Sequence, residues 1–320
     1  MAKVFNRIEI KNILKETTPD TLIEYMEEAF TLYSSGLAVL PPVGTLTFNS
    51  PPGDMHIKYG YVQGDSHYVV KIASGFYENP SLGLSSSNGL NLVFSQKTGV
   101  LETILLDEGL LTDIRTAVAG AIVSKYLAPK KVKAIGIMGS GIQARLQLEY
   151  LKSVVDCQKV FVWGRSDEKL QAYKNDMTSK GYDIITTQDS RLIGRECNLI
   201  ITTTPSTSPI FFEEDLQKGT HITAVGADTT GKQELDITIL ERANLIVLDS
   251  AQQCQVHGEI HKAFQKNLLV KQRLVELGEI ISSGGYLRRD EDITIADLTG
   301  IATQDIQISK FILERALERE

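Results

Sequence analysis

A glycine-rich segment near the middle of the chain has the residue types and spacing that bind the phosphates of a dinucleotide. It reads G-x-G-x-x-A and consists of Gly139, Ser140, Gly141, Ile142, Gln143 and Ala144. The segment follows an apolar strand pattern and precedes a helical pattern, so its backbone N–H groups are expected at a helix N-terminus. Gly139 suits the tight turn, Gly141 lets the pyrophosphate approach, and Ala144 lets helix and strand pack closely. We predict a dinucleotide site here, although such glycines also form ordinary turns.

The end of the next predicted strand indicates which dinucleotide to expect. An acid that binds the ribose 2′-hydroxyl usually lies about 20 residues after the glycines. This chain instead has four residues without a carboxylate: Trp163, Gly164, Arg165 and Ser166. Arg165 and Ser166 can donate hydrogen bonds to a 2′-phosphate, which predicts NADP(H) in preference to NAD(H). In the alternative interpretation Arg165 is solvated and Asp167 or Glu168 binds the ribose, so NAD(H) stays possible.

Hydrophobic patterning divides the chain into segments that must position these residues. Residues 18–33 predict an amphipathic helix, with Thr18 as N-cap and Pro19 at the first helical position. Residues 43–104 contain short alternating segments between Gly, Pro and Asn, which predict a mostly antiparallel sheet. From residue 133, short apolar strands alternate with helical segments, which predicts parallel βαβ units. Residues 304–320 predict a terminal amphipathic helix. The expected fold class is α/β, a Rossmann-type doubly wound parallel sheet plus an antiparallel α+β domain.

Length and composition restrict the class of protein. The chain has 320 residues, 42% hydrophobic and 23% charged, which is typical of a globular protein of about two domains. A net charge of −7 argues against nucleic acid and anionic membranes as partners. No apolar run reaches the roughly 20 residues that span a bilayer, and the first residues lack an apolar signal core. Three widely spaced cysteines fit a reducing compartment, so we expect a cytoplasmic protein.

Several segments together resemble the ornithine cyclodeaminase and mu-crystallin family over nearly the whole chain. They are VKI at 70–72, FYENP at 76–80, LTDIRTA at 111–117, GSGIQA at 139–144, AVGAD at 224–228, GKQEL at 231–235 and DLTG at 297–300. The resemblance implies a Rossmann domain and an antiparallel domain that binds substrate and forms a homodimer. We therefore expect residues 1–114 with 304–320 to form the substrate and dimerisation domain, and residues 115–303 the NAD(P)-binding domain.

The resemblance also implies roles for three charged residues. Lys71 matches the family's catalytic lysine, whose ammonium can bind a carboxylate or give a proton at an imine. Arg115 matches an arginine that can fork onto a substrate carboxylate or the cofactor phosphates. Asp228 matches the acid that takes protons from the substrate amine in cyclodeaminases. The alternatives are a solvated lysine at the end of an edge strand, a charge at a helix start and a turn aspartate.

The same segments imply further contacts, with one departure from the family pattern. The residues expected beside the cofactor are Thr116, Thr203, Thr204, Val225, Gly226 and Asp228, with Arg115. Many relatives carry an arginine in the first strand of the substrate domain, but residues 40–45 contain none. Lys58, on the same strand face as His56, could supply the missing cation, or both could be ordinary strand residues. His257 and His261 lie four residues apart, but we expect no metal because a third ligand is lacking.

These features predict an enzyme, an NADPH-dependent ketimine reductase. The expected substrate is a small cyclic imino acid, Δ1-pyrroline-2-carboxylate giving L-proline, with Δ1-piperidine-2-carboxylate giving L-pipecolate as the next choice. Lys71 and Lys58 would hold the carboxylate with Arg115 near it, and Lys71 or Asp228 would manage the proton on nitrogen. Two alternatives stay open: an NAD-dependent ornithine cyclodeaminase that forms L-proline and ammonia, and a non-catalytic binding protein like mu-crystallin.

Overall fold

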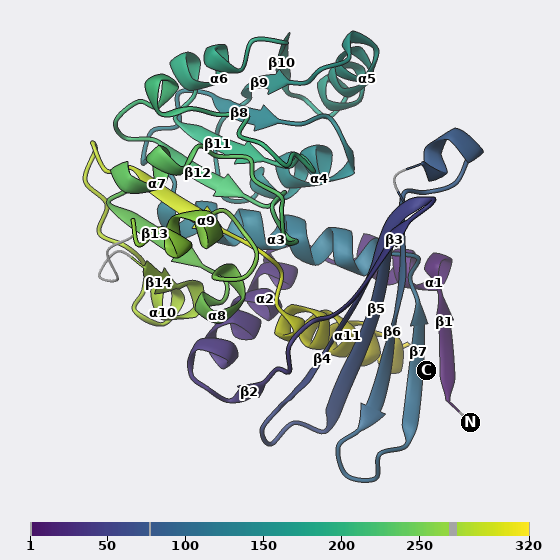
Figure 1. Cartoon of the computed structure of the whole chain (residues 1–320). Helices are drawn as coiled ribbons and strands as arrows, with labels where there is room; N and C mark the ends of the chain where they lie inside the picture. Colours follow the sequence, from purple (N-terminus) through teal and green to yellow (C-terminus); the bar gives the residue numbers. More distant parts are fainter. Residues whose placement is uncertain (1, 77, 269–273, 320) are drawn as a thin grey trace. The chain divides into compact units, whose positions relative to one another are not determined.

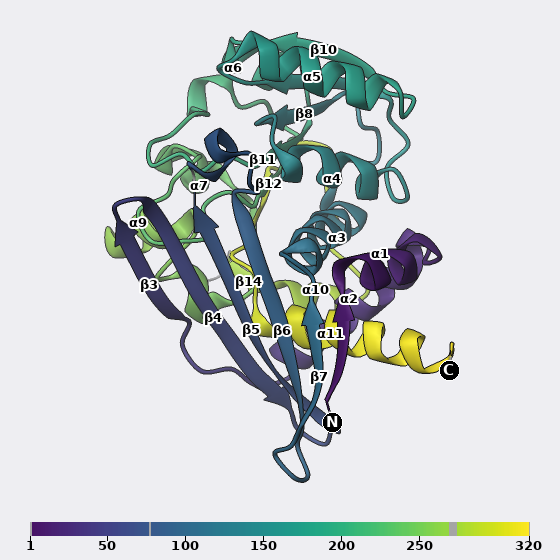
Figure 2. The same ribbon diagram turned by 90° about the vertical axis from the view of Figure 1, so that its right-hand side faces the viewer.

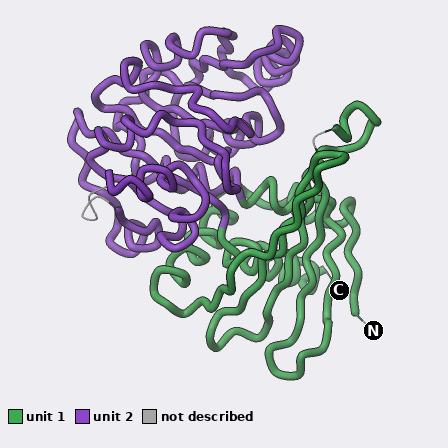
Figure 3. The backbone as a smooth tube through the Cα atoms, in the orientation of Figure 1, with its two compact units in different colours: residues 1–115, 301–320 green, residues 116–300 purple. Residues whose placement is uncertain are grey.

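The chain folds into two compact units, and the N-terminal and C-terminal segments both belong to the first of them (Figures 1 and 3). The computed structural model describes residues 2–76, 78–268 and 274–319. Unit 1 comprises Met1–Arg115 and Ile301–Glu320, and unit 2 comprises Thr116–Gly300. Unit 1 is therefore discontinuous in sequence, with unit 2 inserted between its sheet and its last helix.

Unit 1 is built on a mixed sheet with the strand order β1-β7-β6-β5-β4-β2, in which β3 also pairs with β4. The strands are β1 (Lys3–Asn6), β2 (Ala38–Val39), β3 (Gly44–Asn49), β4 (Pro52–Val62), β5 (His67–Phe76), β6 (Ser87–Ser95) and β7 (Leu101–Leu106). Neighbouring strands are antiparallel except β1, which runs parallel to β7. The sequence pattern did not reveal β1, because a short exposed strand lacks a buried face to produce alternation.

Helices cover one face of this sheet (Figure 2). They are α1 (Arg7–Lys15), α2 (Pro19–Ser34), the first residues of α3 (Leu110–Leu127) and α11 (Ala302–Leu317), and η1 (Asn79–Leu82) is a short 3-10 turn. Thr18 accepts a hydrogen bond from the Thr21 backbone N–H and Pro19 begins α2, as predicted. Helix α11 packs on β4, β5 and β6 and against α2, and 11 of its 16 residues are buried. The terminal helix ends at Leu317, and Glu320 lies outside the described residues.

The two faces of the central strands differ in chemistry. On the face toward α11, Val62, Val69 and Val93 are buried, together with the polar Lys71 and Asn91. The opposite face, here called the open face, is apolar and partly exposed. Its side chains come from β4, β5, β6 and β7 and are Ile57, Tyr59, Tyr61, Tyr68, Val70, Ile72, Leu90, Leu92, Phe94 and Ile104.

Unit 2 is a doubly wound parallel sheet, as the βαβ pattern predicted. Its strand order is β10-β9-β8-β11-β12-β15-β13-β14. Its strands are β8 (Ile135–Met138), β9 (Lys159–Trp163), β10 (Asp183–Thr187), β11 (Leu199–Thr202), β12 (His221–Ala224), β13 (Leu245–Leu248), β14 (Leu274–Glu276) and β15 (Thr294–Asp297). Central strands are fully buried because helices lie on both faces. The order reverses between β8 and β11, the position where such sheets bind ligands beyond the strands' carboxyl ends.

The helices of unit 2 lie between its strands in sequence, as in βαβ crossovers. Besides the rest of α3, they are α4 (Ile142–Leu151), α5 (Asp167–Thr178), α6 (Ser190–Glu196), α7 (Ile237–Arg242), α8 (Ala251–Cys254), α9 (Ile260–Gln265) and α10 (Leu277–Ser282), with the 3-10 turn η2 (Glu213–Asp215). Among the described residues, no helix combines the length and apolar character needed to cross a membrane.

Candidate active site

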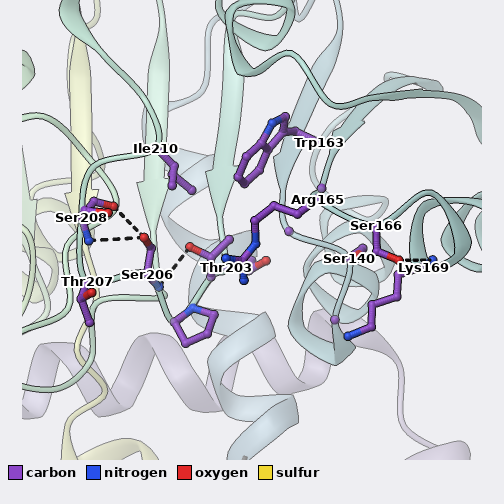
Figure 4. Close-up of a pocket in the computed structure, with 15 residues that line it drawn as sticks. Ser140, Trp163, Arg165, Ser166, Lys169, Thr203, Ser206, Thr207, Ser208 and Ile210 are labelled. Carbon is purple, nitrogen blue, oxygen red and sulfur yellow. Dashed lines mark hydrogen bonds between the residues drawn. The ribbon is translucent and has the colours of Figure 1, made fainter.

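A cavity of about 630 Å³ lies at the carboxyl ends of β8, β9 and β11 in unit 2 (Figure 4). Fifteen residues line it: Gly139, Ser140, Gly141, Trp163, Gly164, Arg165, Ser166, Lys169, Thr203, Thr204, Pro205, Ser206, Thr207, Ser208 and Ile210. The cavity therefore brings together the glycine loop, the end of β9 and the threonines after β11, three segments that the sequence predicted for the cofactor.

The glycine loop has the backbone geometry that a pyrophosphate requires. Gly139 has a φ of +122°, which only glycine adopts without strain, and its N–H donates to the Trp163 carbonyl at 2.9 Å. Gly141 is the N-cap of α4, and a Cβ built on it would meet no atom within 4 Å. The Arg145 Nη1 donates a hydrogen bond to the Ser140 carbonyl at 2.6 Å and so fixes the loop to α4. Open space beside a helix N-terminus fits a phosphate group.

The end of β9 offers two cations and a hydroxyl to this cavity. The Ser166 hydroxyl caps α5 by accepting a hydrogen bond from the Lys169 N–H at 3.4 Å. The Lys169 side chain lies beside Ser140 and Ser166, and the Arg165 side chain extends toward Thr203 (Figure 4). Sequence reasoning missed Lys169, one turn into α5. Asp167 does not line the cavity, because its Oδ1 accepts from Gln188 Nε2 at 2.6 Å.

Not every predicted cofactor residue lines the cavity. Ala144 is fully buried where α4 packs on the sheet, as the third position of the motif predicts. Four more lie outside the lining: Ile142 and Gln143, which begin α4, and Val225 and Gly226, which follow β12. Thr116 also lies outside it, and its carbonyl accepts a hydrogen bond from Gln147 Nε2 at 3.0 Å.

A buried charged cluster in unit 1 contains Lys71. Its Nζ lies 3.1 Å from Asp305 Oδ1, and the Arg115 Nε donates to the same oxygen at 2.9 Å. The Arg115 Nη1 also donates to Gln304 Oε1 at 3.3 Å. Lys71, Arg115 and Asp305 are each at most 4% exposed. Lys71 lies in the middle of β5, between β4 and β6, so the alternative of a solvated lysine ending an edge strand is wrong.

Other polar groups complete this cluster. Lys58 pairs with Lys71 across β4 and β5, and Asn91 pairs with it across β5 and β6. Asp107, directly after β7, is 1% exposed, and its Oδ2 accepts from the Leu111 N–H at 2.8 Å. Three buried oxygens have no hydrogen-bond partner in the structure: Asn91 Oδ1, Asp107 Oδ1 and Asp305 Oδ2. Such orphaned acceptors in a charged cluster indicate where donors of a bound molecule or of water can be accommodated.

Burial and charge shift the titration of this cluster. Burial and, after it, the charge of Arg115 lower the pKa of Lys71 to about 7, although Asp305 opposes them. Burial alone would raise the pKa of Asp305, but Arg115 and Lys71 hold it below its usual range. Burial raises the pKa of Asp107 to about 6, against the hydrogen bond from Leu111. Lys71 can therefore gain or lose a proton near neutral pH, as a general acid or base must.

The remaining predicted residues have ordinary local partners. His56 shares a face of β4 with Lys58, and its ring lies between Thr45 and Asp54, at 3.3 Å from each side chain. Asp228 is half-exposed after β12, and its Oδ1 accepts from Lys232 Nζ at 2.7 Å. The His261 Nδ1 lies 2.7 Å from the Gln255 carbonyl. Within the described part of the chain, no cluster of three or more His, Cys, Asp or Glu residues could hold a metal ion.

Comparison with known proteins agrees with this arrangement. The family model described as "Ornithine cyclodeaminase/mu-crystallin family" matches residues 5–320. This chain belongs to the ornithine cyclodeaminase/mu-crystallin family. The resemblance seen in the sequence is thus confirmed, and with it a nicotinamide-dependent oxidoreductase with the Rossmann-type fold.

Named relatives in this family carry out different reactions. An alanine dehydrogenase from Archaeoglobus fulgidus is 35% identical over 94% of this chain and 91% of its own length. A Δ1-pyrroline-2-carboxylate reductase from Bacillus cereus is 33% identical over 93% and 92%. The Thermococcus litoralis Δ1-pyrroline-2-carboxylate reductase with NADH and L-proline superposes with a TM-score of 0.91 at 26% identity, covering 99% and 98% of the chains. An archaeal alanine dehydrogenase dimer with NAD superposes with a TM-score of 0.89 at 32% identity, covering 99% and 97%.

Sequence reasoning missed the partners of the charged cluster. Asp305 and Gln304 lie in the first turn of α11, and Asn91 and Asp107 lie in and after strands with no motif around them. No distinct signal marks residues 304–305 in the sequence, because the same helix carries other polar residues, among them Thr303, Gln307 and Ser309. The carboxylate Glu234 in the GKQEL segment was also missed as an individual residue.

Proposed function

We propose that this family member reduces a small cyclic imino acid with NADPH, most simply Δ1-pyrroline-2-carboxylate to L-proline. The observation that carries the proposal is the buried Lys71, held by Asp305 and accompanied by Arg115 and Lys58. Two further cations beside a lysine that titrates near neutral pH suit a substrate with one carboxylate and one nitrogen that must be protonated.

The proposed reaction adds a hydride to the imine carbon and a proton to the nitrogen, so the C=N bond becomes a CH–NH bond. A bound nicotinamide cofactor supplies the hydride. Lys58 and Arg115 would bind the carboxylate, and the Lys71 ammonium would give the proton to the nitrogen and regain one from water. The unpartnered Asp305 Oδ2 and Asn91 Oδ1 lie in the same cluster and are acceptors for the N–H of the product.

The preference for NADPH rests on the end of β9. Arg165, Ser166 and Lys169 line the cavity there, while Asp167 is bonded to Gln188 and lies outside its lining. A 2′-phosphate therefore meets two cations and a hydroxyl, and no carboxylate that would repel it. This composition favours net reduction over the hydride-recycling cyclodeaminase reaction, which starts from oxidised cofactor. The proposal assigns cofactor binding to unit 2, and substrate binding and dimerisation to unit 1.

The proposed homodimer forms through the open face of unit 1. Tyr59 and Tyr61 are each 38% exposed, and Tyr61 pairs across β4 and β5 with Tyr68, whose ring stacks on that of Phe94. A continuous apolar sheet face of this kind is rarely left to water in a monomer. The archaeal alanine dehydrogenase is described as a dimer, which supports a second copy of the same chain as the occupant.

The direct test follows the loss of NADPH absorbance with Δ1-pyrroline-2-carboxylate or Δ1-piperidine-2-carboxylate, in parallel with NADH. L-ornithine with NAD, assayed for ammonia, tests the cyclodeaminase alternative. Lys71→Met should lower kcat by several orders of magnitude. Lys310→Met removes a lysine of α11 that pairs with Asp65, and it should leave kcat within about twofold. Ammonia and proline from ornithine would refute the reductase and make Asp228 the base; tight ligand binding without turnover would favour the binding protein.

A further inference from the structure

The carboxylate of Glu234 is fully buried and ties together the loops that follow two neighbouring strands of unit 2. Its Oε1 accepts hydrogen bonds from the Thr204 N–H at 2.6 Å and the Thr204 hydroxyl at 2.7 Å. Its Oε2 accepts from the Thr202 hydroxyl at 2.7 Å and the Gly226 N–H at 2.9 Å. Four donors around one carboxylate fill the places where a carboxylate accepts, so the side chain acts as a shared anchor for the ends of β11 and β12.

The two loops come very close to each other at Gly226. A Cβ on Gly226 would collide with the Thr204 carbonyl and with the Glu234 carboxylate itself. The two loops therefore approach at backbone contact distance, with Glu234 between them. If an amide NH₂ replaced one carboxylate oxygen of Glu234, its N–H groups would face the N–H and O–H donors that the oxygen now accepts from. This costs more free energy than the loss of a single hydrogen bond.

Glu234 is itself held from behind by a second buried acid. Glu259 Oε1 accepts from the Glu234 N–H at 2.8 Å, and Oε2 accepts from the Leu235 N–H at 2.9 Å. Asp297, at the end of β15, in turn accepts from the Ile260 N–H at 3.0 Å. Burial raises the pKa of Glu234 to about 7, although the hydrogen bonds from Thr202 and Thr204 oppose it. The GKQEL and DLTG segments thus meet in one set of buried carboxylates behind the loops.

The position of Thr204 defines what this anchor can control. In the cavity of Figure 4, Ser166 and Lys169 lie at one end and Ser206 and Ser208 lie at the other. The β9 end is where the adenosine ribose binds in this class of sheet, and the β11 end, across the reversal in strand order, receives the other half of the dinucleotide. Thr204 lines the cavity at the β11 end and is bonded to Glu234 through both its N–H and its hydroxyl.

We propose that Glu234 is a positioning residue that shapes the nicotinamide half of the cofactor cavity without contacting the adenosine half. The inference rests on the dinucleotide orientation proposed above. Through Thr204 and Gly226 it fixes the wall against which the nicotinamide ribose and ring are oriented. Because Glu234 is fully buried behind these loops, it offers no surface to an imino acid and acts only through the cofactor.

The test compares a whole cofactor with a fragment that has only the adenosine half. For Glu234→Gln, the Kd of NADPH, measured by fluorescence titration, should rise about tenfold, since hydrogen bonds to a charged group are broken. The Kd of 2′,5′-ADP, measured by calorimetry, should stay within about twofold. Thr204→Val, which removes one hydroxyl donor and keeps the backbone N–H, should give a smaller effect with the same selectivity.

Asp292→Asn is the matched control. Asp292 is also buried in unit 2 and accepts from the Tyr286 hydroxyl at 2.8 Å and the Arg289 N–H at 2.9 Å. It precedes β15 and so lies at the amino ends of the parallel strands, whereas the cavity lies at their carboxyl ends. It should leave both affinities within about twofold. Equal weakening of NADPH and 2′,5′-ADP in Glu234→Gln, or no weakening of NADPH in either Glu234→Gln or Thr204→Val, would overturn the inference. Selective weakening in a protein that does not reduce imino acids would leave it standing and refute only the proposed reaction.

Discussion

Replacing Asp305 by Asn tests whether one carboxylate sets the protonation of the proposed catalytic lysine. The Lys71 Nζ and Asp305 Oδ1 are 3.1 Å apart with side chains 3% and 2% exposed, so solvent screens the pair very little. At an effective dielectric constant of about 20, two unit charges at that distance attract with about 5 kcal/mol, which is an upper limit. An opposite charge this close typically shifts a pKa by roughly one to three units.

The direction of the change follows from the causes acting on Lys71. Burial and Arg115 already lower its pKa to about 7, and Asp305 is the group that opposes them; Lys58 acts in the same direction as Arg115. Without the Asp305 charge the pKa should fall further, to between about 4 and 6. If turnover needs the protonated lysine, kcat/KM declines as pH rises through this pKa. The declining limb should therefore move from near pH 7 to between about pH 4 and 6 in Asp305→Asn.

The assay is the pH profile of kcat/KM for imine reduction, with Asp65→Asn as the matched control. Asp65 pairs at 3.2 Å with Lys310, which lies in α11 as Asp305 does, and not with Lys71. Removing the Asp65 charge should therefore leave the pH profile unchanged. Asp305→Asn is also expected to lose about 3–5 kcal/mol of unfolding free energy, because two buried cations lose their partner. That deficit should shrink between pH 5 and 7 as Lys71 loses its proton in the folded variant. An unshifted limb in a folded Asp305→Asn would refute the reasoning.

Three further outcomes are expected. Arg165→Ala and Lys169→Ala should each raise the Kd of NADPH about tenfold or more and change that of NADH less than twofold, by fluorescence titration; equal effects on both cofactors would contradict the 2′-phosphate assignment. Burial lowers the pKa of His221 to about 3, so below about pH 6.5 the unfolded state binds a proton that the native state does not. The free energy of unfolding, measured with denaturant, should therefore fall by up to about 1.4 kcal/mol per pH unit as the pH drops below about 6.5. His221→Asn should weaken this pH dependence, and an identical slope in the variant would contradict His221 as its origin. Tyr61→Lys on the open face should convert the dimer to monomer in light scattering, and a wild-type monomer would refute the interface.

Local patterns were sufficient to predict the parallel sheet and the glycine loop. Strands β8, β11 and β12 are short, apolar and buried on both faces, so they stand out without any tertiary information. The positive φ of Gly139 and the N-cap position of Gly141 are local features that the motif predicts, whereas the contacts of Gly139 with Trp163 and Thr203 arise from the fold. Lys169 was missed because its contribution depends on the direction of one helix relative to a loop.

The charged cluster could be predicted only in part, because its members meet through tertiary packing. Lys71 and Asp305 are 234 positions apart, and Arg115 and Asp305 are 190 apart. No periodicity connects a mid-strand lysine with the first turn of a distant helix. Pattern reasoning placed Lys58 on one strand face with His56, and the resemblance singled out Lys71 and Arg115. Neither could reveal that Lys58 and Lys71 pair across β4 and β5, or that α11 brings the carboxylate that both Lys71 and Arg115 contact.

The discontinuous unit 1 has a consequence for how the protein is made. A nascent chain that has reached residue 300 already contains the whole of unit 2, with the glycine loop and both cations at the end of β9. The strands of unit 1 were synthesised earlier, but Lys71 has no counter-ion until α11 leaves the ribosome and docks on β4, β5 and β6. A chain that ends before α11 would therefore contain every residue of the proposed cofactor cavity but would lack the carboxylate that both Lys71 and Arg115 contact.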